Sequence, residues 1–148
     1  MTASDLEPDR YVQYREFQTP QGPVYRPVVH ALFSRGEASV ELSMLVDSGA
    51  DNIVLPYYAL DFLGINAAEC TRVTAGTLYG GQEGLTSAPL HVSFPDLWSG
   101  RGFQTGVVFT PFLDSFAYGL LGREPTFDYI ECRFGHRSGF GFRLRFAP

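Results

Sequence analysis

Apolar positions in this chain gather in short runs, and glycine or proline interrupts them every few residues. Runs of this length that are rich in Val, Phe, Tyr and Leu are typical of β-strands. Two segments, residues 57–63 and 124–128, could each form a turn or two of helix. The pattern predicts a mostly β fold with one or two short helices and with strands over residues 24–33, 38–46, 52–56, 71–76, 87–94, 103–109, 118–121, 129–134 and 140–146.

The chain has 148 residues, which is most simply one domain. We expect residues 21–148 to form it, and residues 1–20 to be an N-terminal extension or an edge strand. Residues 75–84, AGTLYGGQEG, are rich in glycine and stand between two strand-like runs. That composition predicts the mobile tip of a hairpin.

Charge and composition exclude several functions. The net charge is −5, and all 11 basic residues are arginine with no basic run, which argues against nucleic-acid binding. The lysine of a nucleotide-binding P-loop is missing, and no cofactor is expected. No stretch reaches the ~20 apolar residues of a membrane span, and the N-terminus has no signal pattern, so a cytoplasmic protein without membrane contact is expected.

The cysteines and histidines carry no metal pattern. Cys70 and Cys132 are far apart and form no CxxC pair, so both are expected to be buried free thiols. The three histidines show neither HExxH spacing nor a cysteine partner at zinc-site spacing. No metal site is predicted.

The stretch MLVDSGADNIVLP, residues 44–56, contains the most informative chemistry. An apolar run stops at the carboxylate of Asp47, and a second apolar run begins only after Asp51. Ionised carboxylates avoid apolar surroundings unless their loss of hydration is compensated. Either the segment is an ordinary strand–turn–strand corner, or Asp47 is placed there for chemistry.

Three motifs in order resemble the retropepsins, the single-domain aspartic proteases of retroviral type. An apolar strand delivers DSGA, a glycine-rich LYGGQEG follows where the family carries its flap, and YGLLGRE at residues 118–124 matches the second family signature. The resemblance covers roughly residues 24–146. It implies a closed acid-protease β-barrel with a flap hairpin, and its termini look more like bacterial or cellular members than viral ones.

The resemblance makes Asp47 the catalytic residue. Peptide hydrolysis by this chemistry needs two carboxylates on one water, and two carboxylates so close share a proton. One then acts as general base on the water while the other polarises the scissile carbonyl. The chain has a single Asp-Ser-Gly, so the implied enzyme is a homodimer in which two copies of Asp47 meet on a two-fold axis.

The resemblance also implies an active-site support. The Ser48 hydroxyl would bond across the dimer interface, although an ordinary turn serine is an equally good reading of the residue alone. Arg123 would pair with Asp51 and brace the loop, where the alternative is a surface arginine. Ala50 and Gly122 complete this support, and Gly122 favours a buried Arg123 because it allows close backbone packing.

Five positions are implied in substrate binding. Gly49 lets a substrate strand approach closely, and Asp51 can face the substrate backbone. Tyr79, Gly80 and Gly81 would form the flap tip that closes over an extended peptide, the alternative being a solvent-exposed hairpin. The partners expected are therefore a second copy of the chain and a peptide or protein substrate.

Two other functions stay open. A retropepsin-like domain without catalysis could bind peptides or serve as a dimerisation module, which the polar flap and unfamiliar termini would suit. An unrelated β-barrel binding protein could carry Asp47 merely as a turn residue.

Overall fold

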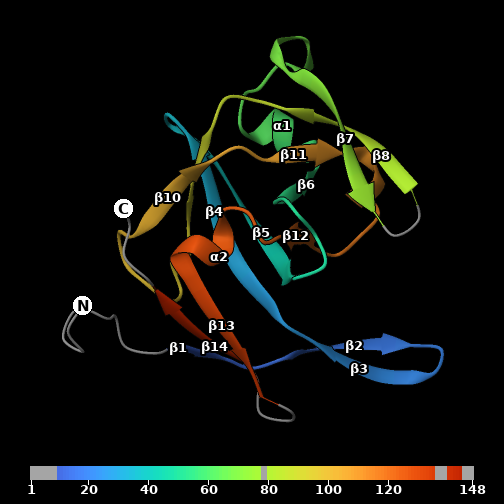
Figure 1. The fold of residues 1–148 in the computed structure, drawn as a ribbon, viewed down its shortest axis with the longest axis vertical. Helices are drawn as coiled ribbons and strands as arrows, with labels where there is room; N and C mark the ends of the chain where they lie inside the picture. Colours follow the sequence, from blue (N-terminus) through green and yellow to red (C-terminus); the bar gives the residue numbers. More distant parts are fainter. Residues whose placement is uncertain (1–9, 78–79, 136–139, 145–148) are drawn as a thin grey trace.

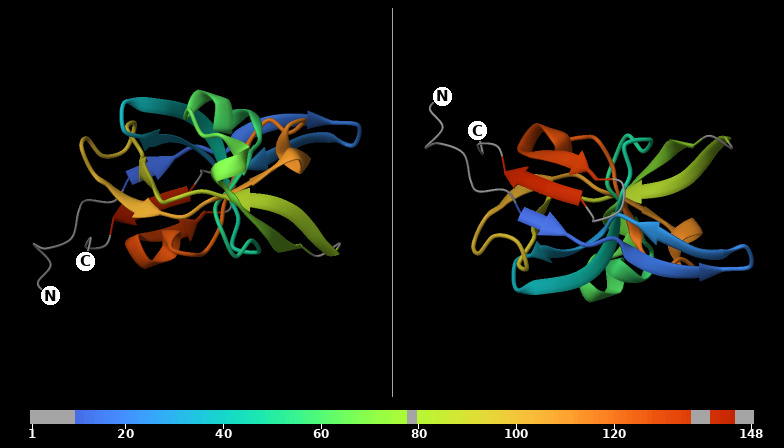
Figure 2. Two further views of the ribbon diagram at one scale, coloured as in Figure 1. Left: turned by 90° about the horizontal axis from the view of Figure 1, so that it is seen from above. Right: turned by 90° about the horizontal axis from the view of Figure 1, so that it is seen from below.

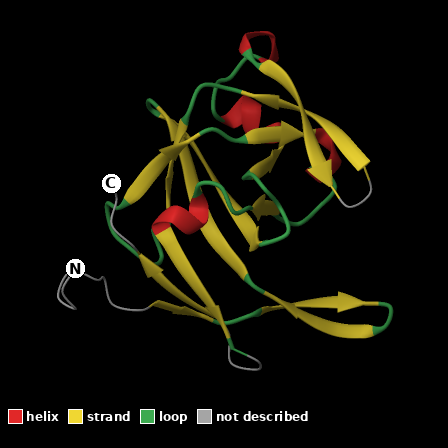
Figure 3. Cartoon of the chain, viewed as in Figure 1, coloured by secondary structure: helices red, strands yellow, loops and turns green. Residues whose placement is uncertain are grey.

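The computed structural model describes residues 10–77, 80–135 and 140–144. Strands dominate this part of the chain, as Figure 3 shows. The strands are β1 (Arg10–Val12), β2 (Arg15–Thr19), β3 (Gly22–Arg26), β4 (Val28–Arg35), β5 (Ala38–Val46), β6 (Val54–Pro56), β7 (Thr71–Thr77), β8 (Gly80–Thr86), β9 (Leu90–Ser93), β10 (Gly102–Thr105), β11 (Val108–Thr110), β12 (Gly119–Leu121), β13 (Ile130–Phe134) and β14 (Phe140–Leu144).

The helices of the described chain are short. They are α1 (Tyr58–Phe62), α2 (Thr126–Tyr129) and two 3-10 turns, Ala67–Glu69 and Pro111–Leu113. Both α-helices lie where the sequence predicts them. Within the described residues, no helix combines the length and the apolar character needed to cross a membrane.

Nine strands form one curled sheet, in the order β10-β9-β4-β5-β12-β6-β11-β8-β7 (Figure 1). Most neighbours are antiparallel, but β12 runs parallel to β5, and β11 runs parallel to β6. A three-stranded sheet, β1-β14-β13, and the separate hairpin β2–β3 complete the described fold. The parallel pair β5–β12 brings the two sequence signatures side by side, although about seventy residues separate them.

The core lies inside the curled sheet. Along β5, Val40, Leu42, Met44 and Val46 are buried, with more exposed residues between them. This period of two puts one face of the strand in the core. Phe33 and Phe109 are fully buried there as well, and burial of such a side chain contributes roughly 1.5–3 kcal/mol. The strand β5, which Asp47 follows directly, is therefore anchored in the core along its length.

Two predicted strands are each divided in the structure. Residues 24–33 form β3 and β4, which part at Pro27, because proline has no N–H to donate to a neighbouring strand. Residues 103–109 form β10, at one edge of the large sheet, and β11, which lies between β6 and β8. A sequence run cannot show that its two halves pair with different neighbours.

The glycine-rich segment is more regular than predicted. Residues 75–77 and 80–84 continue β7 and β8, which stay paired down to Thr77 and Gly80. Close packing explains why residue 84 is a glycine. A Cβ there would lie 2.6 Å from Cγ1 of Val108 and 2.9 Å from the carbonyl oxygen of Phe109. The glycine therefore lets β11 lie close against β8.

The N-terminal segment contributes strands in its described part. β1 lies at the edge of the three-stranded sheet, and β2 pairs with β3 in a hairpin that projects from the body (Figures 1 and 2). At its base, Nη1 of Arg26 donates to the hydroxyl of Tyr118 at 2.9 Å, and the Phe17 ring meets the Tyr118 ring edge-on. A division of the chain at residue 20 would fall in the turn of this hairpin, and it stays a prediction.

Both cysteines are free, but they are partly exposed rather than buried as expected. Burial, followed by the charge of Glu131, raises the pKa of the Cys132 thiol to about 12. Burial and the charge of Glu69 also raise the pKa of Cys70.

We expect Cys132 to resist thiol reagents in the native protein. At pH 8 a thiol of that pKa is ionised in about one molecule in ten thousand, and only the thiolate reacts. Maleimide labelling of Cys70→Ser should be slow until denaturant is added, whereas Cys132→Ser, which keeps Cys70, should label at least about tenfold faster. Equal native rates would contradict this difference.

Candidate functional site

Asp47 follows β5 directly. The N–H of Val46 donates to the carbonyl of Pro27 at 2.9 Å, and the N–H of Asp47 donates to the carbonyl of Leu121 at 3.1 Å. Its side-chain Oδ1 accepts a hydrogen bond from the N–H of Gly49 at 2.8 Å. The carboxylate is half-buried, and its orientation is fixed by its own loop. A Cβ on Gly49 would lie 3.1 Å from that Oδ1, so a side chain there would press on the carboxylate.

The segment after β12 holds this loop in place through its backbone. The N–H of Arg123 donates to the carbonyl of Ala50 at 2.9 Å, and the N–H of Glu124 donates to the carbonyl of Asp51 at 2.8 Å. Asn52 and Glu124 form an isolated parallel bridge. The two sequence signatures thus form one structural unit.

Gly122 makes that close approach possible. A Cβ at this position would overlap the carbonyl oxygen of Asn52 and lie 2.8 Å from that of Ala50. Both are backbone atoms, so no side-chain rotation could relieve the clash. Gly122 is buried, and the unit requires glycine here.

The predicted contact between Arg123 and Asp51 is present. Nη2 of Arg123 donates to Oδ1 of Asp51 in an ion pair. The two side chains are 56% and 62% exposed, so the expected burial of Arg123 is wrong for the single chain. An ion pair this exposed contributes at most about 1 kcal/mol to stability. The backbone bonds beside it therefore hold the loop more than the charges do.

Ser48 is exposed, and its hydroxyl has no hydrogen-bond partner among the described residues. It does not cap its own turn, which was the alternative that the sequence left open. Gly80 and Gly81 belong to β8 and pair with Thr77 and Gly76, while Tyr79 lies outside the described residues. In Figure 1 the hairpins β7–β8 and β2–β3 project from the same side of the molecule, with the loop after β5 between them.

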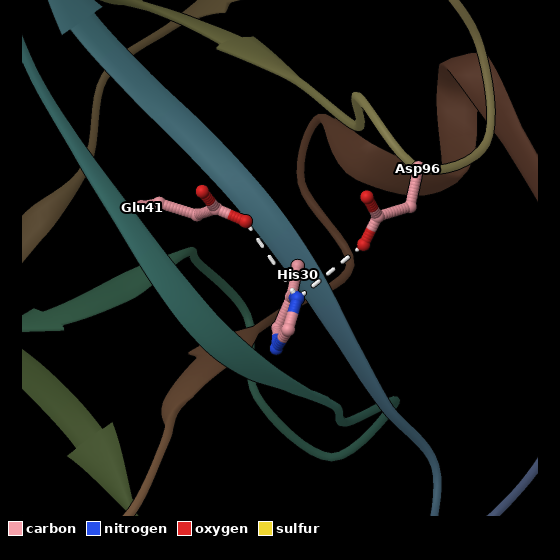
Figure 4. A group of neighbouring side chains, drawn as sticks. All are labelled: His30, Glu41 and Asp96. Atoms are coloured by element: carbon pink, nitrogen blue, oxygen red, sulfur yellow. Dashed lines mark ion pairs between the residues drawn. The ribbon is translucent and has the colours of Figure 1, made fainter.

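One cluster that the sequence does not reveal has donors spaced closely enough for a metal ion. Among the described residues it joins His30 of β4, Glu41 of β5 and Asp96 of the loop after β9 (Figure 4). Nδ1 of His30 lies 3.6 Å from Oε1 of Glu41 and 3.3 Å from Oδ2 of Asp96. Sheet pairing, which brings β4 beside β5, assembles it.

The other side of the His30 ring favours a hydrogen-bonded polar patch over a metal centre. Nη2 of Arg15 lies 3.0 Å from Nε2 of His30, and an arginine can only donate. Nε2 must then supply its lone pair, which puts the ring proton on Nδ1, the atom that would have to bind the metal. The Nδ1–H points to the two carboxylates instead.

Comparison with known proteins identifies the fold. No protein-family model matches the sequence, and no curated protein does. Among solved structures, a retropepsin-like aspartic protease from Rickettsia conorii matches with a TM-score of 0.60 and 16% identity, over 94% of this chain and 95% of that chain. The chain has the retropepsin-like fold.

A second solved structure agrees. The protease of EIAV, in complex with the inhibitor HBY-793, matches with a TM-score of 0.52 and 22% identity, over 70% of this chain and 86% of that one. The retropepsin-like resemblance and the mostly β fold class are confirmed. At identities this low, the structural match establishes the fold, and the roles of Asp47 and its neighbours are proposals.

We predict that Gly122→Ala disrupts the site. The added methyl meets fixed backbone atoms, so the free energy of unfolding should fall by about 2–4 kcal/mol. Gly106→Ala is the matched control, because a Cβ at Gly106 meets no heavy atom within 4 Å. Urea unfolding followed by circular dichroism measures both variants. Equal stability of the two variants would show that the contact at Gly122 is not tight.

Proposed function

We propose that this protein is an aspartic endopeptidase that hydrolyses peptide bonds with two Asp47 carboxylates, one from each chain of a homodimer. The observation that carries the proposal is the fixed carboxylate of Asp47 at the end of β5, in a loop clamped by residues 122–124. The retropepsin-like fold, which the chain shares with solved aspartic proteases, supports it.

The requirement for a second chain follows from the chemistry. A single Asp-Ser-Gly supplies one carboxylate, and the mechanism needs a second within hydrogen-bonding reach of the same water. A two-fold axis beside Asp47 brings an identical carboxylate to that position. Ser48 and Gly49 are exposed in the single chain, which leaves room for a partner's loop.

In the dimer, the two Asp47 carboxylates would share one proton, because two negative charges so close repel each other strongly. The ionised member removes a proton from the water as the water attacks the scissile carbonyl. The protonated member donates a hydrogen bond to the carbonyl oxygen, where negative charge develops. The proton then passes to the leaving amine as the C–N bond breaks.

Ser48 and Asp51 take the supporting roles. The Ser48 hydroxyl, which has no partner within the described chain, would bond to the partner's loop and fix the distance between the two carboxylates. Asp51, already paired with Arg123, keeps one carboxylate oxygen free for the N–H of a bound peptide.

The substrate would bind as an extended strand between the Asp47 loop and the hairpin β7–β8. Main-chain hydrogen bonds supply affinity in this mode, and side-chain cavities supply preference. The hairpin, with Gly80 and Gly81 next to its tip, would close over the peptide and exclude water from the two carboxylates.

We predict that Asp47→Asn abolishes peptide cleavage, with a loss of at least about a thousandfold in kcat/KM, because an amide can neither accept the proton nor share one. Asp61→Asn, which changes an exposed aspartate of α1, should keep wild-type activity. Cleavage of a peptide library, read by mass spectrometry, measures both variants.

Retention of activity in Asp47→Asn would contradict the proposal. If the wild type cleaves nothing, and a statine-type transition-state analogue shows no saturable binding, the chain is better described as a non-catalytic peptide-binding or dimerisation domain.

A further inference from the structure

Two cavities border the base of the hairpin β7–β8. The larger, about 670 Å³, is lined by residues that include Cys70, Arg72 and Glu83. The smaller, about 430 Å³, lies between the hairpin, residues 105–108 and the segment that follows Gly122. Asn52, at the end of the Asp47 loop, is one of its walls, so this smaller cavity adjoins the proposed catalytic site. Its volume is in the range of ordinary ligand pockets.

The charges that line the two cavities differ. The larger cavity holds a cation and an anion, Arg72 and Glu83. Among the described residues that line the smaller cavity, Glu124 is the one with an ionisable side chain. The neighbouring cation, Arg123, is engaged with Asp51, and Glu124 makes no ion pair with any described residue. The smaller cavity therefore presents one uncompensated negative charge.

The remaining walls suit a long side chain with a charged end. Val73 and Val108 give aliphatic surface, and the hydroxyls of Thr74 and Thr86 add hydrogen-bonding capacity. A lysine or arginine side chain places its methylene groups against apolar surface while its head reaches a polar or charged group. An aspartate or glutamate in this cavity would instead meet the like charge of Glu124.

We propose that this cavity binds a lysine or arginine side chain of the substrate and that Glu124 selects it. The inference rests on the proposed endopeptidase function, which it deepens by naming a substrate class. Because a homodimer has two such cavities related by the two-fold axis, the basic residue can lie on either side of the scissile bond.

The backbone at Glu124 allows a clean test. Its N–H bonds to the carbonyl of Asp51, and its bridge to Asn52 is also made by the main chain. Both contacts survive a change of side chain. Glu124→Gln thus removes the charge while it keeps the shape and the loop.

The experiment compares peptides that are identical except for one position, which carries lysine, glutamine or glutamate and is moved through the residues that flank the scissile bond. At one or more positions, the wild type should cleave the lysine peptide about tenfold faster than the glutamine peptide in kcat/KM. The preference should shrink when the salt concentration is raised, because mobile ions screen the charges.

Glu124→Gln should lose this preference while it still cleaves the glutamine peptide, and Glu124→Lys should reverse it in favour of the glutamate peptide. Glu83→Gln is the matched control: it removes an exposed carboxylate of β8 that lines the other cavity, and the preference for lysine should persist. Circular dichroism confirms that each variant is folded.

The outcomes separate the two proposals. The role of Glu124 is overturned if the wild type is active but shows no preference for lysine at any position. It is also overturned if Glu124→Gln keeps the preference unchanged. Either result leaves the endopeptidase proposal in place. If the wild type cleaves no peptide, the endopeptidase fails. The binding of the three peptides to Asp47→Asn, measured by fluorescence anisotropy, then tests the cavity separately from cleavage. Tighter binding of the lysine peptide supports the proposed cavity, and equal binding of the three peptides overturns it.

Discussion

The close parallel contact between the Asp47 loop and the segment after β12 is the constraint on which the rest of the site depends. A loop of this kind has little structure of its own, so its shape comes from what it touches. Here the main-chain hydrogen bonds of Arg123 and Glu124 define it, and they form only because Gly122 has no side chain. The ion pair beside them is exposed and adds little. Backbone proximity, more than charge, positions the carboxylate.

In the proposed dimer, the same constraint gives each chain half of a symmetric active site. One oxygen of Asp47 accepts a hydrogen bond from the N–H of Gly49, and a single chain supplies only one Asp-Ser-Gly carboxylate. Ser48, next to it, is exposed and without a partner there. A rigid acid beside a free hydroxyl is the arrangement that a two-fold partner would complete. In this account, the dimer assembles the catalytic chemistry from two preformed half-sites and does not remodel them.

The sequence predicts local features of this protein well and non-local ones poorly. The sequence alone predicts the two signatures and the mostly β pattern. It also predicts the pairing of Arg123 with Asp51, through the family resemblance. The break at Pro27 follows from the missing N–H of proline, which is a local property. The prediction of one continuous strand there relied on the hydrophobic pattern and did not use it. The cluster around His30 and the cavity beside Glu124 depend on which strands become neighbours, and strand pairing over long separations leaves no signature in the chain. Exposure of Arg123 likewise follows from tertiary packing.

Subunit mixing tests the proposed shared active site most directly. Wild-type protein is mixed with increasing amounts of Asp47→Asn at constant total concentration, with time for the chains to exchange, and peptide cleavage is measured. If two Asp47 carboxylates form one site, mixed dimers are inactive and the rate follows the square of the wild-type fraction, about one quarter at equal amounts. A rate that falls in direct proportion to the wild-type fraction, about one half at equal amounts, would show that each chain acts alone and would contradict the account.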